Sequence, residues 1–216
     1  MAITAITEAI KTLTEAEQRF KLARTEEEVF FTEWRIDLPT LTEIDKTQLN
    51  QLRQRYLYQR AENQLLEATV MLLFASPLLT IAGLFDPPFK VRSEESIQLI
   101  FNDGEEVLQG RIDVLVLQNQ LWVVVLESKK TALSVWTALP QTLAYLTANP
   151  QPKLPSFGMM TNGDEIIFVK LTQGEQVKYD VSRVFSPFIS NQELYQVVQI
   201  LRSIGHTIRL LAEVRE

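Results

Sequence analysis

The chain has 216 residues, of which 46% are hydrophobic and 22% are charged, the balance of a soluble globular protein with one domain or with one domain and an appendage. It contains no cysteine, which excludes a disulfide framework and a thiolate metal site and fits a reducing cytoplasm. The formal net charge of −6 does not favour tight nonspecific binding to nucleic acid, although an empty metal site is itself acidic and a local basic patch matters more than the total.

Two stretches bear on targeting and on membranes. The first residues lack the basic stretch and the long apolar run of a signal peptide. The most apolar stretch, Ala68 to Leu84, is interrupted by Ser76, Pro77 and Thr80 and is short for a membrane span. We therefore expect a buried helix there and a cytoplasmic protein that does not contact a membrane.

Residues 4 to about 75 are predicted to be helical almost throughout, because apolar residues recur at three- and four-residue spacing. Pro39 breaks this pattern, and a second helix is expected from about Asp45 to Glu62, or on towards Leu73. Residues 1–61 should then form a helical N-terminal extension. It would pack on the rest of the chain, pair with another subunit, or do both.

After Pro88 the pattern changes to short runs rich in Val, Leu and Ile, with turn signals such as Asn102-Asp103-Gly104 between them. A mixed sheet covered by helices on both faces is the economical packing for such an order, so the predicted fold class is α/β. The expected strands are 97–101, 107–117, 121–126, 157–161 and 166–171, and the expected helices are about 134–148 and 191–213, the first with Pro140 near its start.

One strand pair carries the residues that suggest chemistry. If the turn after Leu117 spans Asn119 to Leu121, Asp113 lies directly opposite Glu127, and Lys129 shares their face because side chains alternate with period two. Two neighbouring carboxylates repel each other unless a cation compensates, and oxygen ligands suit Mg²⁺. Lys129 would orient or help deprotonate an attacking water, or neutralise charge on a phosphate.

The same residues also have a simpler interpretation. An E-x-K triplet is expected by chance roughly once in a chain of this length. The three side chains would then be a polar strand end beside a helix, held by ordinary ion pairs. Two further features favour the chemical interpretation: Gly110 precedes Asp113 by three positions, and Gln141 and Tyr145 lie one turn apart on the following helix.

Taken in order, G-x-x-D at 110–113, E-x-K at 127–129 and Q-x-x-x-Y at 141–145 resemble the PD-(D/E)XK nuclease superfamily, in particular its RecB-like branch. The layout is also similar to the nuclease domain at the amino end of type I restriction R subunits. The resemblance covers about residues 62 to 171, and it implies a restriction-endonuclease-like α/β nuclease domain over residues 62–216.

The resemblance implies a role for each residue of these motifs. Asp113, Glu127 and the backbone carbonyl of Ser128 would bind Mg²⁺, with Mn²⁺ as a substitute, and Lys129 would serve the attacking water. The catalytic set implied by the family comprises Glu67, Asp113, Glu127, Lys129, Gln141 and Tyr145.

In that set Gln141 and Tyr145 would contact DNA or hold the catalytic groups in place. Glu67 would be the helix carboxylate, because it stands ten residues before Pro77-Leu78-Leu79, a segment similar to the P-L-L stretch of the R-subunit helix. Glu62 is the alternative for that position, and either glutamate would also fit an exposed place on a helix.

The chain departs from the family pattern in two respects. Ile112 stands where the family name has proline, a position at which members vary. No P-loop motif occurs, so a role in type I restriction needs separate subunits. The predicted function is therefore a Mg²⁺-dependent deoxyribonuclease for restriction or repair, with DNA as partner and with a homodimer or separate restriction-system subunits as assemblies. The alternatives are an inactive nuclease-like binding or assembly module and a purely structural partner protein.

Three other features are assigned to structure rather than to chemistry. His206 is the only histidine, so a zinc site is not expected. The segment Arg53–Arg60 interleaves basic and aromatic residues and is the best local basic patch, but we favour a solvated helix face with its tyrosines packed inward. The tryptophans are assigned to packing; they are Trp34, Trp122 and Trp136.

Overall fold

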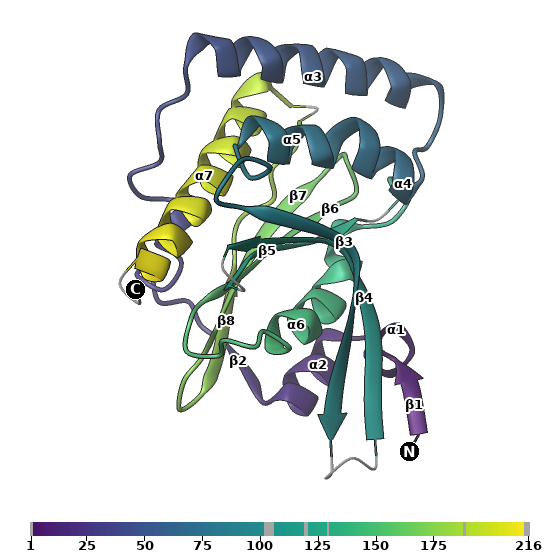
Figure 1. Cartoon of the computed structure of the whole chain (residues 1–216). Coiled ribbons are helices and arrows are strands. Elements are labelled where there is room, and N and C mark those ends of the chain that lie inside the picture. The colour runs from purple at the N-terminus through teal and green to yellow at the C-terminus, as the bar shows by residue number, and fades with distance from the viewer. Residues whose placement is uncertain (1, 102–105, 119–120, 129, 188, 214–216) are drawn as a thin grey trace.

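A computed structural model gives the fold (Figure 1). The structure describes residues 2–101, 106–118, 121–128, 130–187 and 189–213, and within these ranges it leaves out the side chains of residues 2, 101 and 121–128.

The described residues form one mixed sheet whose strand order is β1-β4-β5-β6-β7-β8-β2, with β3 on the other edge of β4. The pairs β1–β4, β5–β6 and β2–β8 are parallel, and the remaining pairs are antiparallel. The strands are β1 (Ala2–Ala5), β2 (Leu22–Arg24), β3 (Lys90–Phe101), β4 (Glu106–Gln118), β5 (Leu121–Ser128), β6 (Ser156–Thr161), β7 (Ile166–Gln173) and β8 (Val177–Val181).

Helices cover both faces of this sheet (Figure 1). On one face lie α3 (Glu43–Glu62), α4 (Glu67–Val70), a π-helical turn (Met71–Ala75), α5 (Ser76–Ile81) and α7 (Asn191–Glu213); on the other lie α1 (Ile6–Ala9), α2 (Leu13–Phe20) and α6 (Leu139–Thr147), the last preceded by a 3-10 turn (Val135–Ala138).

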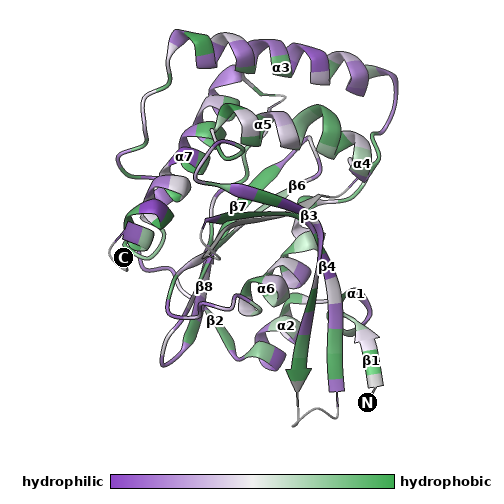
Figure 2. Cartoon of the chain, in the orientation of Figure 1, coloured by the Kyte–Doolittle hydropathy of each residue, from purple (hydrophilic) through white to green (hydrophobic). Residues whose placement is uncertain are grey.

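Each helix layer encloses its own hydrophobic core. Alternate side chains of a strand point to opposite faces, so Met159 and Phe168 enter the core under α3 and α7, whereas Met160 and Ile167 enter the core under α6. Figure 2 shows that α3 is mostly hydrophilic, in keeping with its place at the outside of its layer. A capping box between Thr42 and Asp45 starts this helix, because each satisfies a backbone N–H of the other.

The predicted α/β class is confirmed, with a mixed sheet and helices on both faces. The helix expected from Asp45 to Glu62 is present as α3, and the one expected at 191–213 is present as α7. Pro140 occupies the first turn of α6, where its missing N–H leaves no helical hydrogen bond unmade.

The prediction that residues 4 to about 75 are helical almost throughout is correct for α1, α2 and α3 but misses two strands. Residues 2–5 and 22–24 are strands that pair with β4 and β8, so the predicted extension of residues 1–61 contributes to the same sheet as the rest of the chain. Lys21 ends α2 in the left-handed conformation, with φ of 53°, and the chain then runs on as β2. Short apolar runs fit either period, and pairing with a distant strand decides between them.

Two strand predictions need correction as well. β3 begins at Lys90 rather than at Ile97. The sequence does not indicate its first half, because the residues there are charged and exposed and show no alternation of apolar side chains. β8 was not predicted, although Val177 to Val181 completes a hairpin with β7. This segment has no alternating apolar pattern of its own and forms a strand because it pairs with β7.

Candidate active site at a fork in the sheet

β4 has two different neighbours along one of its edges. β1 pairs with residues 106–109, whereas β5 pairs with residues 114–118. The stretch from Gly110 to Asp113 lies between the two ladders, where the sheet forks (Figure 1). The G-x-x-D motif therefore occupies the one stretch of β4 at which neither strand covers this edge.

A cavity of about 560 Å³ opens at this fork. It brings together four of the predicted catalytic residues, from three separate parts of the chain. Its lining residues are Ala5, Ile6, Thr7, Glu67, Ser96, Gln109, Gly110, Arg111, Asp113, Gln141 and Tyr145. A larger cavity of about 830 Å³ lies between α3 and α5, but no carboxylate lines it among the described residues. The smaller cavity is therefore the candidate site.

Gln141 and Tyr145 hold the backbone of β4 in place at the fork. The Gln141 amide donates a hydrogen bond to the Tyr145 hydroxyl, which in turn donates to the backbone carbonyl of Arg111 at 3.1 Å. Tyr145 is 1% exposed, so this chain of hydrogen bonds is largely shielded from water. The Q-x-x-x-Y spacing thus places both side chains over the motif on β4.

Gly110 allows α6 to approach β4 this closely. A Cβ atom at this position would lie 2.7 Å from Cε1 of Tyr145 and 2.8 Å from Cδ1 of Ile6. Real Cβ atoms do not approach other heavy atoms so closely, so any side chain here would push Tyr145 away from the Arg111 carbonyl. The glycine and the tyrosine of the two motifs are therefore parts of one contact.

Asp113 stands where β4 passes from one core to the other. Ile112 packs in the core under α6, whereas Val114 packs in the core under α3 and α7. On the neighbouring strand, Glu94 adopts a left-handed conformation with φ of 55°, between the pairs that β3 makes with Ile112 and Val114. The resulting bend leaves Asp113 half-buried at the rim of the cavity.

The pairing of β4 with β5 indicates which residue of β5 faces Asp113. The antiparallel ladder ends at Val114↔Leu126, and one further step along this register sets Asp113 opposite Glu127. The first pair of the ladder is Gln118↔Leu121, whereas the predicted register pairs Gln118 with Trp122. An irregularity between Val116 and Leu117 shifts the pairing by one residue, so that it follows the predicted register from Val116 to Val114. The side chains of Glu127 and Ser128, and the whole of Lys129, lie outside the described residues.

Glu67 lines the cavity and Glu62 is not among its lining residues. Glu62 is the last residue of α3, whereas Glu67 is the first residue of α4 and is exposed. Thr131 ties the start of α4 to the segment after β5, because its N–H donates to the Leu65 carbonyl at 3.1 Å and its hydroxyl accepts from the Leu65 N–H at 3.0 Å. Sequence reasoning missed Thr131, for which no motif exists.

Two carboxylates, those of Glu67 and Asp113, therefore line the same cavity. Among the described residues, no group of three or more histidine, cysteine or acidic side chains is placed to hold a metal ion. The predicted ligand set includes the Glu127 side chain, which is not one of the described side chains. The donor chemistry at the fork, carboxylate and carbonyl oxygen, is of the kind that Mg²⁺ prefers.

The residues that the sequence assigned to structure lie away from the fork. In the basic segment of α3, Tyr56 is buried and donates to Asp164 at 2.7 Å, Arg60 pairs with the same carboxylate, and Tyr58 is 73% exposed. Burial and this bond raise the pKa of the Tyr56 hydroxyl well above its usual value. The predicted inward packing thus holds for one tyrosine of the two.

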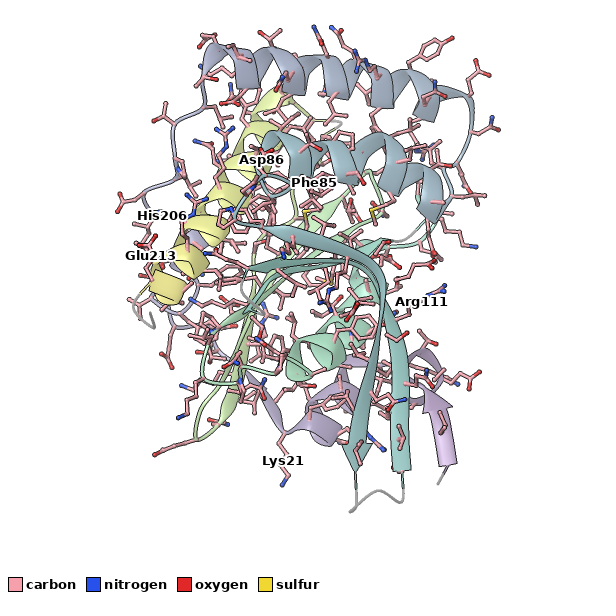
Figure 3. The ribbon with its side chains drawn as sticks, in the orientation of Figure 1. Lys21, Phe85, Asp86, Arg111, His206 and Glu213 are labelled. Atoms are coloured by element: carbon pink, nitrogen blue, oxygen red, sulfur yellow. The ribbon has the colours of Figure 1, made fainter. Side chains whose placement is uncertain are left out.

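His206 is exposed on α7, far along the chain from the motifs (Figure 3). Trp34 packs against the core with its ring nearly perpendicular to that of Phe185, and Trp136 is 43% exposed. The Trp122 side chain lies outside the described residues.

Part of the chain is similar to a known protein family. A family model described as "Type I restriction enzyme R protein N terminus (HSDR_N)" matches residues 89–177, which run from the start of β3 to the start of β8. The matched region is less than half of the chain. It contains Asp113, Glu127, Lys129, Gln141 and Tyr145 but not Glu67.

A similar solved structure is a fragment of a proposed HsdR subunit of a type I restriction enzyme from Vibrio vulnificus YJ016, with 19% sequence identity and a TM-score of 0.41. The overlap covers 63% of this chain and 26% of the solved chain, which is itself a fragment, so the match spans about a quarter of that chain. No curated protein matches the chain. None of the described helices is both long enough and apolar enough to cross a membrane.

Proposed function

We propose that the chain is a Mg²⁺-dependent nuclease of the PD-(D/E)XK type that hydrolyses phosphodiester bonds of DNA in a restriction or repair system. The observation that carries the proposal is the cavity at the fork, where Glu67, Asp113, Gln141 and Tyr145 converge beside the diverging ends of β4 and β5. The match of residues 89–177 to the R-protein family supports it, because that match spans both strands and the helix of the motifs.

In this proposal Asp113, Glu127 and the Ser128 carbonyl hold Mg²⁺, and Mn²⁺ substitutes for it. A cation held by these groups would supply charge neutralisation at the phosphate and would make a water more acidic. Glu67 approaches from α4 as a further carboxylate on the wall of the same cavity. Its position is fixed relative to the end of β5 through the Thr131–Leu65 bridge.

The protein groups then have separable roles. Lys129 orients the attacking water, accepts its proton when neutral, or offsets charge on the phosphate as a cation. Gln141 and Tyr145 act as positioning residues, because they fix the carbonyl of Arg111 two residues before Asp113. Arg111 lines the cavity and is exposed, and Figure 3 shows its side chain at the outside of the β3–β4 arm; in this proposal its guanidinium contacts a neighbouring phosphate.

The rival function is a catalytically inactive binding or assembly module on the same scaffold. Two observations favour it: the net charge is −6, and Arg111 is the only basic residue among the described residues that line the cavity. Its ion pair with Glu94, at 3.6 Å, reduces the charge that it offers to DNA. Assembly as a homodimer or with separate restriction-system subunits, and a cytoplasmic location, stay predictions under either function.

A cleavage assay on the full chain separates the two functions. Single- and double-stranded DNA is incubated with the protein and Mg²⁺ or Mn²⁺, alongside the Lys129→Ala, Asp113→Asn and Glu62→Gln variants. The proposal expects the first two variants to lose at least about a hundredfold in rate, the scale of one lost catalytic group, and Glu62→Gln to cut like the parent.

Metal binding provides a second and independent readout. Calorimetry with Mn²⁺ should show binding to the parent and to Lys129→Ala, and loss of binding in Asp113→Asn. Circular dichroism and thermal melting confirm that each variant is folded. A parent that neither cuts DNA nor binds Mn²⁺ would leave the assembly module as the function of this scaffold.

A further inference from the structure

The outer edge of β3 is a long strand edge without a neighbouring strand in the part of the chain that the structure describes. β3 has 12 residues and pairs with β4 alone. The main-chain N–H and C=O groups along its other edge need water or another strand as hydrogen-bonding partner. Such an edge is a template for strand addition unless the chain protects it.

Protection is present in the first half of this edge and absent from the second. In the first half Arg92 pairs with Glu95 at 2.9 Å, and the left-handed Glu94 bends the strand. Charges and local bends of this kind discourage another strand from pairing. The second half, residues 96–101, contains no charged residue, and Figure 2 shows its end in hydrophobic colours. The Ile100 side chain is 64% exposed there.

A groove runs along β3 from the charged pair of its first half to the end of the unprotected half. It consists of two cavities, of about 400 and about 280 Å³, that follow one another along β3. The first is lined by Arg92, Glu95 and Ser96 to Gln98 on β3, by Leu115 and Leu117 on β4, and by Ala148 and Pro150 beyond α6. The second is lined by Leu99 and Ile100 on the strand, and by the end of α6 and the β7–β8 hairpin opposite. β3 thus forms one side of the groove, and the end of α6, the residues after it and the β7–β8 hairpin form the other.

The shape of the groove decides which kind of chain fits it. A helix cannot pair with a strand edge, because its own backbone groups are already bonded to each other. A second copy of the whole sheet would meet the wall that faces β3. An extended segment fits, since its main chain can bond to the edge while every second side chain enters the cavities.

Charge at one end of the groove specifies the segment further. Arg19 and Lys21, at the end of α2, line the cavity next to Ile100. Arg19 is paired with Glu106, whereas Lys21 is exposed and extends beside the lower end of the β3–β4 arm (Figure 3). Lys21 therefore favours an acidic side chain on the segment that binds here.

We propose that β3 accepts an extended segment of a partner protein as an added strand along Ser96 to Ile100. The segment carries apolar side chains at alternate positions, and it places an acidic residue beside Lys21. This surface lies on β3, outside the lining of the candidate active site except for Ser96, so it can be tested apart from nuclease activity.

The test uses a displayed library of random linear peptides selected on the full chain. Peptides with alternating apolar residues and an acidic residue at one end should be enriched, and in the bound state they should slow amide hydrogen exchange in residues 96–100. Ile100→Lys should weaken their binding by about tenfold or more, because a charge on an edge opposes strand addition. The control is Ile44→Lys, an equally exposed isoleucine on α3.

A charge exchange tests the end of the groove. Lys21→Glu should weaken the selected acidic peptides several-fold, and a peptide whose acidic residue is replaced by lysine should bind this variant better than it binds the parent. The proposal is overturned if no peptide is enriched, or if the peptides bind the Ile100→Lys variant as tightly as the Ile44→Lys control. It is also overturned if the parent forms dimers that Ile100→Lys abolishes, because the edge would then belong to a second copy.

Discussion

The two faces of the sheet each place a tyrosine against a glycine, but the hydroxyls are used differently. Under α6, Tyr145 lies over Gly110 and its hydroxyl bonds to neutral groups, the Gln141 amide and a backbone carbonyl. Under α3, Tyr56 lies over Gly163 and its hydroxyl bonds to Asp164. The contact between a tyrosine and a glycine thus holds β4 at the candidate active site on one face, and it attaches α3 to the sheet on the other.

This difference predicts different sensitivities for the two faces. At Gly110, α6 meets β4 through close fit and through hydrogen bonds between uncharged groups, whereas the charged contacts of this face, Arg19–Glu106 and Tyr179–Glu17, lie at α2. The α3 face depends on charged pairs, since Arg60 also binds Asp164 and Arg202 binds Asp45. Substitutions on the two faces should therefore separate effects on the reaction from effects on the attachment of α3.

Gly163→Ala should give the largest loss of stability. Gly163 has φ of 88°, which costs a residue with a side chain about 1 to 2 kcal/mol, and the new Cβ would overlap the Tyr56 hydroxyl, adding about 1 to 3 kcal/mol. Urea unfolding measures the sum. The matched control is Gly174→Ala, where the nearest atom to the added Cβ is 4.0 Å away, and its stability should equal that of the parent.

Gly110→Ala should cost less stability but more activity. The overlap with Tyr145 and Ile6 should lower the free energy of unfolding by about 1 to 3 kcal/mol, without a contribution from backbone strain. Because Asp113 follows on the same strand, DNA cleavage should fall further than it does in Gly163→Ala. Equal cleavage rates in the two variants would show that the contact at Gly110 does not position the site.

Tyr145→Phe and Tyr56→Phe compare the two hydroxyls directly. Tyr145→Phe removes the group that bonds both Gln141 and the Arg111 carbonyl, and should cost about 1 to 3 kcal/mol together with a loss of cleavage rate. Tyr56→Phe should cost less, because Asp164 keeps its pair with Arg60, and it should leave the cleavage rate unchanged. If Tyr56→Phe lost cleavage rate and Tyr145→Phe did not, the Tyr56 hydroxyl rather than the Tyr145 hydroxyl would be the one that positions the site.

The smallest effect is expected from acid. The Arg202 guanidinium, followed by the hydrogen bonds of Thr42, holds the pKa of Asp45 below its usual range. A lowered pKa in the folded state stabilises the protein above the unfolded value, near pH 4, and this contribution is lost as the pH falls below it. Asp45→Asn should therefore be less stable than the parent by about 1 kcal/mol at pH 7, and the difference should shrink below about pH 4. As the pH is lowered, amide hydrogen exchange should accelerate in α3 at a higher pH than it does in α6.

The sequence predicts those parts of the site that rest on local periodicity. Gln141 and Tyr145 share a helix face because they are four residues apart. The register at the end of the β4–β5 ladder agrees with the predicted one, but only because an irregularity between Val116 and Leu117, which the sequence does not indicate, compensates for the different first pair. Asp113 and Glu67 line one cavity, although the two residues are far apart along the chain.

The remaining parts depend on contacts that no local pattern records. β1 is four residues long and exists as a strand because β4 offers it an edge. The bridge between Thr131 and Leu65 joins two loops, and a threonine that follows a strand does not by itself indicate a partner. The reason for Gly110 is visible only once Tyr145 and Ile6 are known to meet it.

The first strand and helix have a practical consequence for anyone who trims this protein. A fragment that starts at residue 62, the boundary that the motifs suggest, would lack Ala5, Ile6 and Thr7 and would leave the lower half of β4 without its parallel neighbour. Such a fragment would lose part of the wall of the candidate site, even if every motif residue were retained. Residues 1–61 should therefore be kept in any protein that is made to test the proposed function.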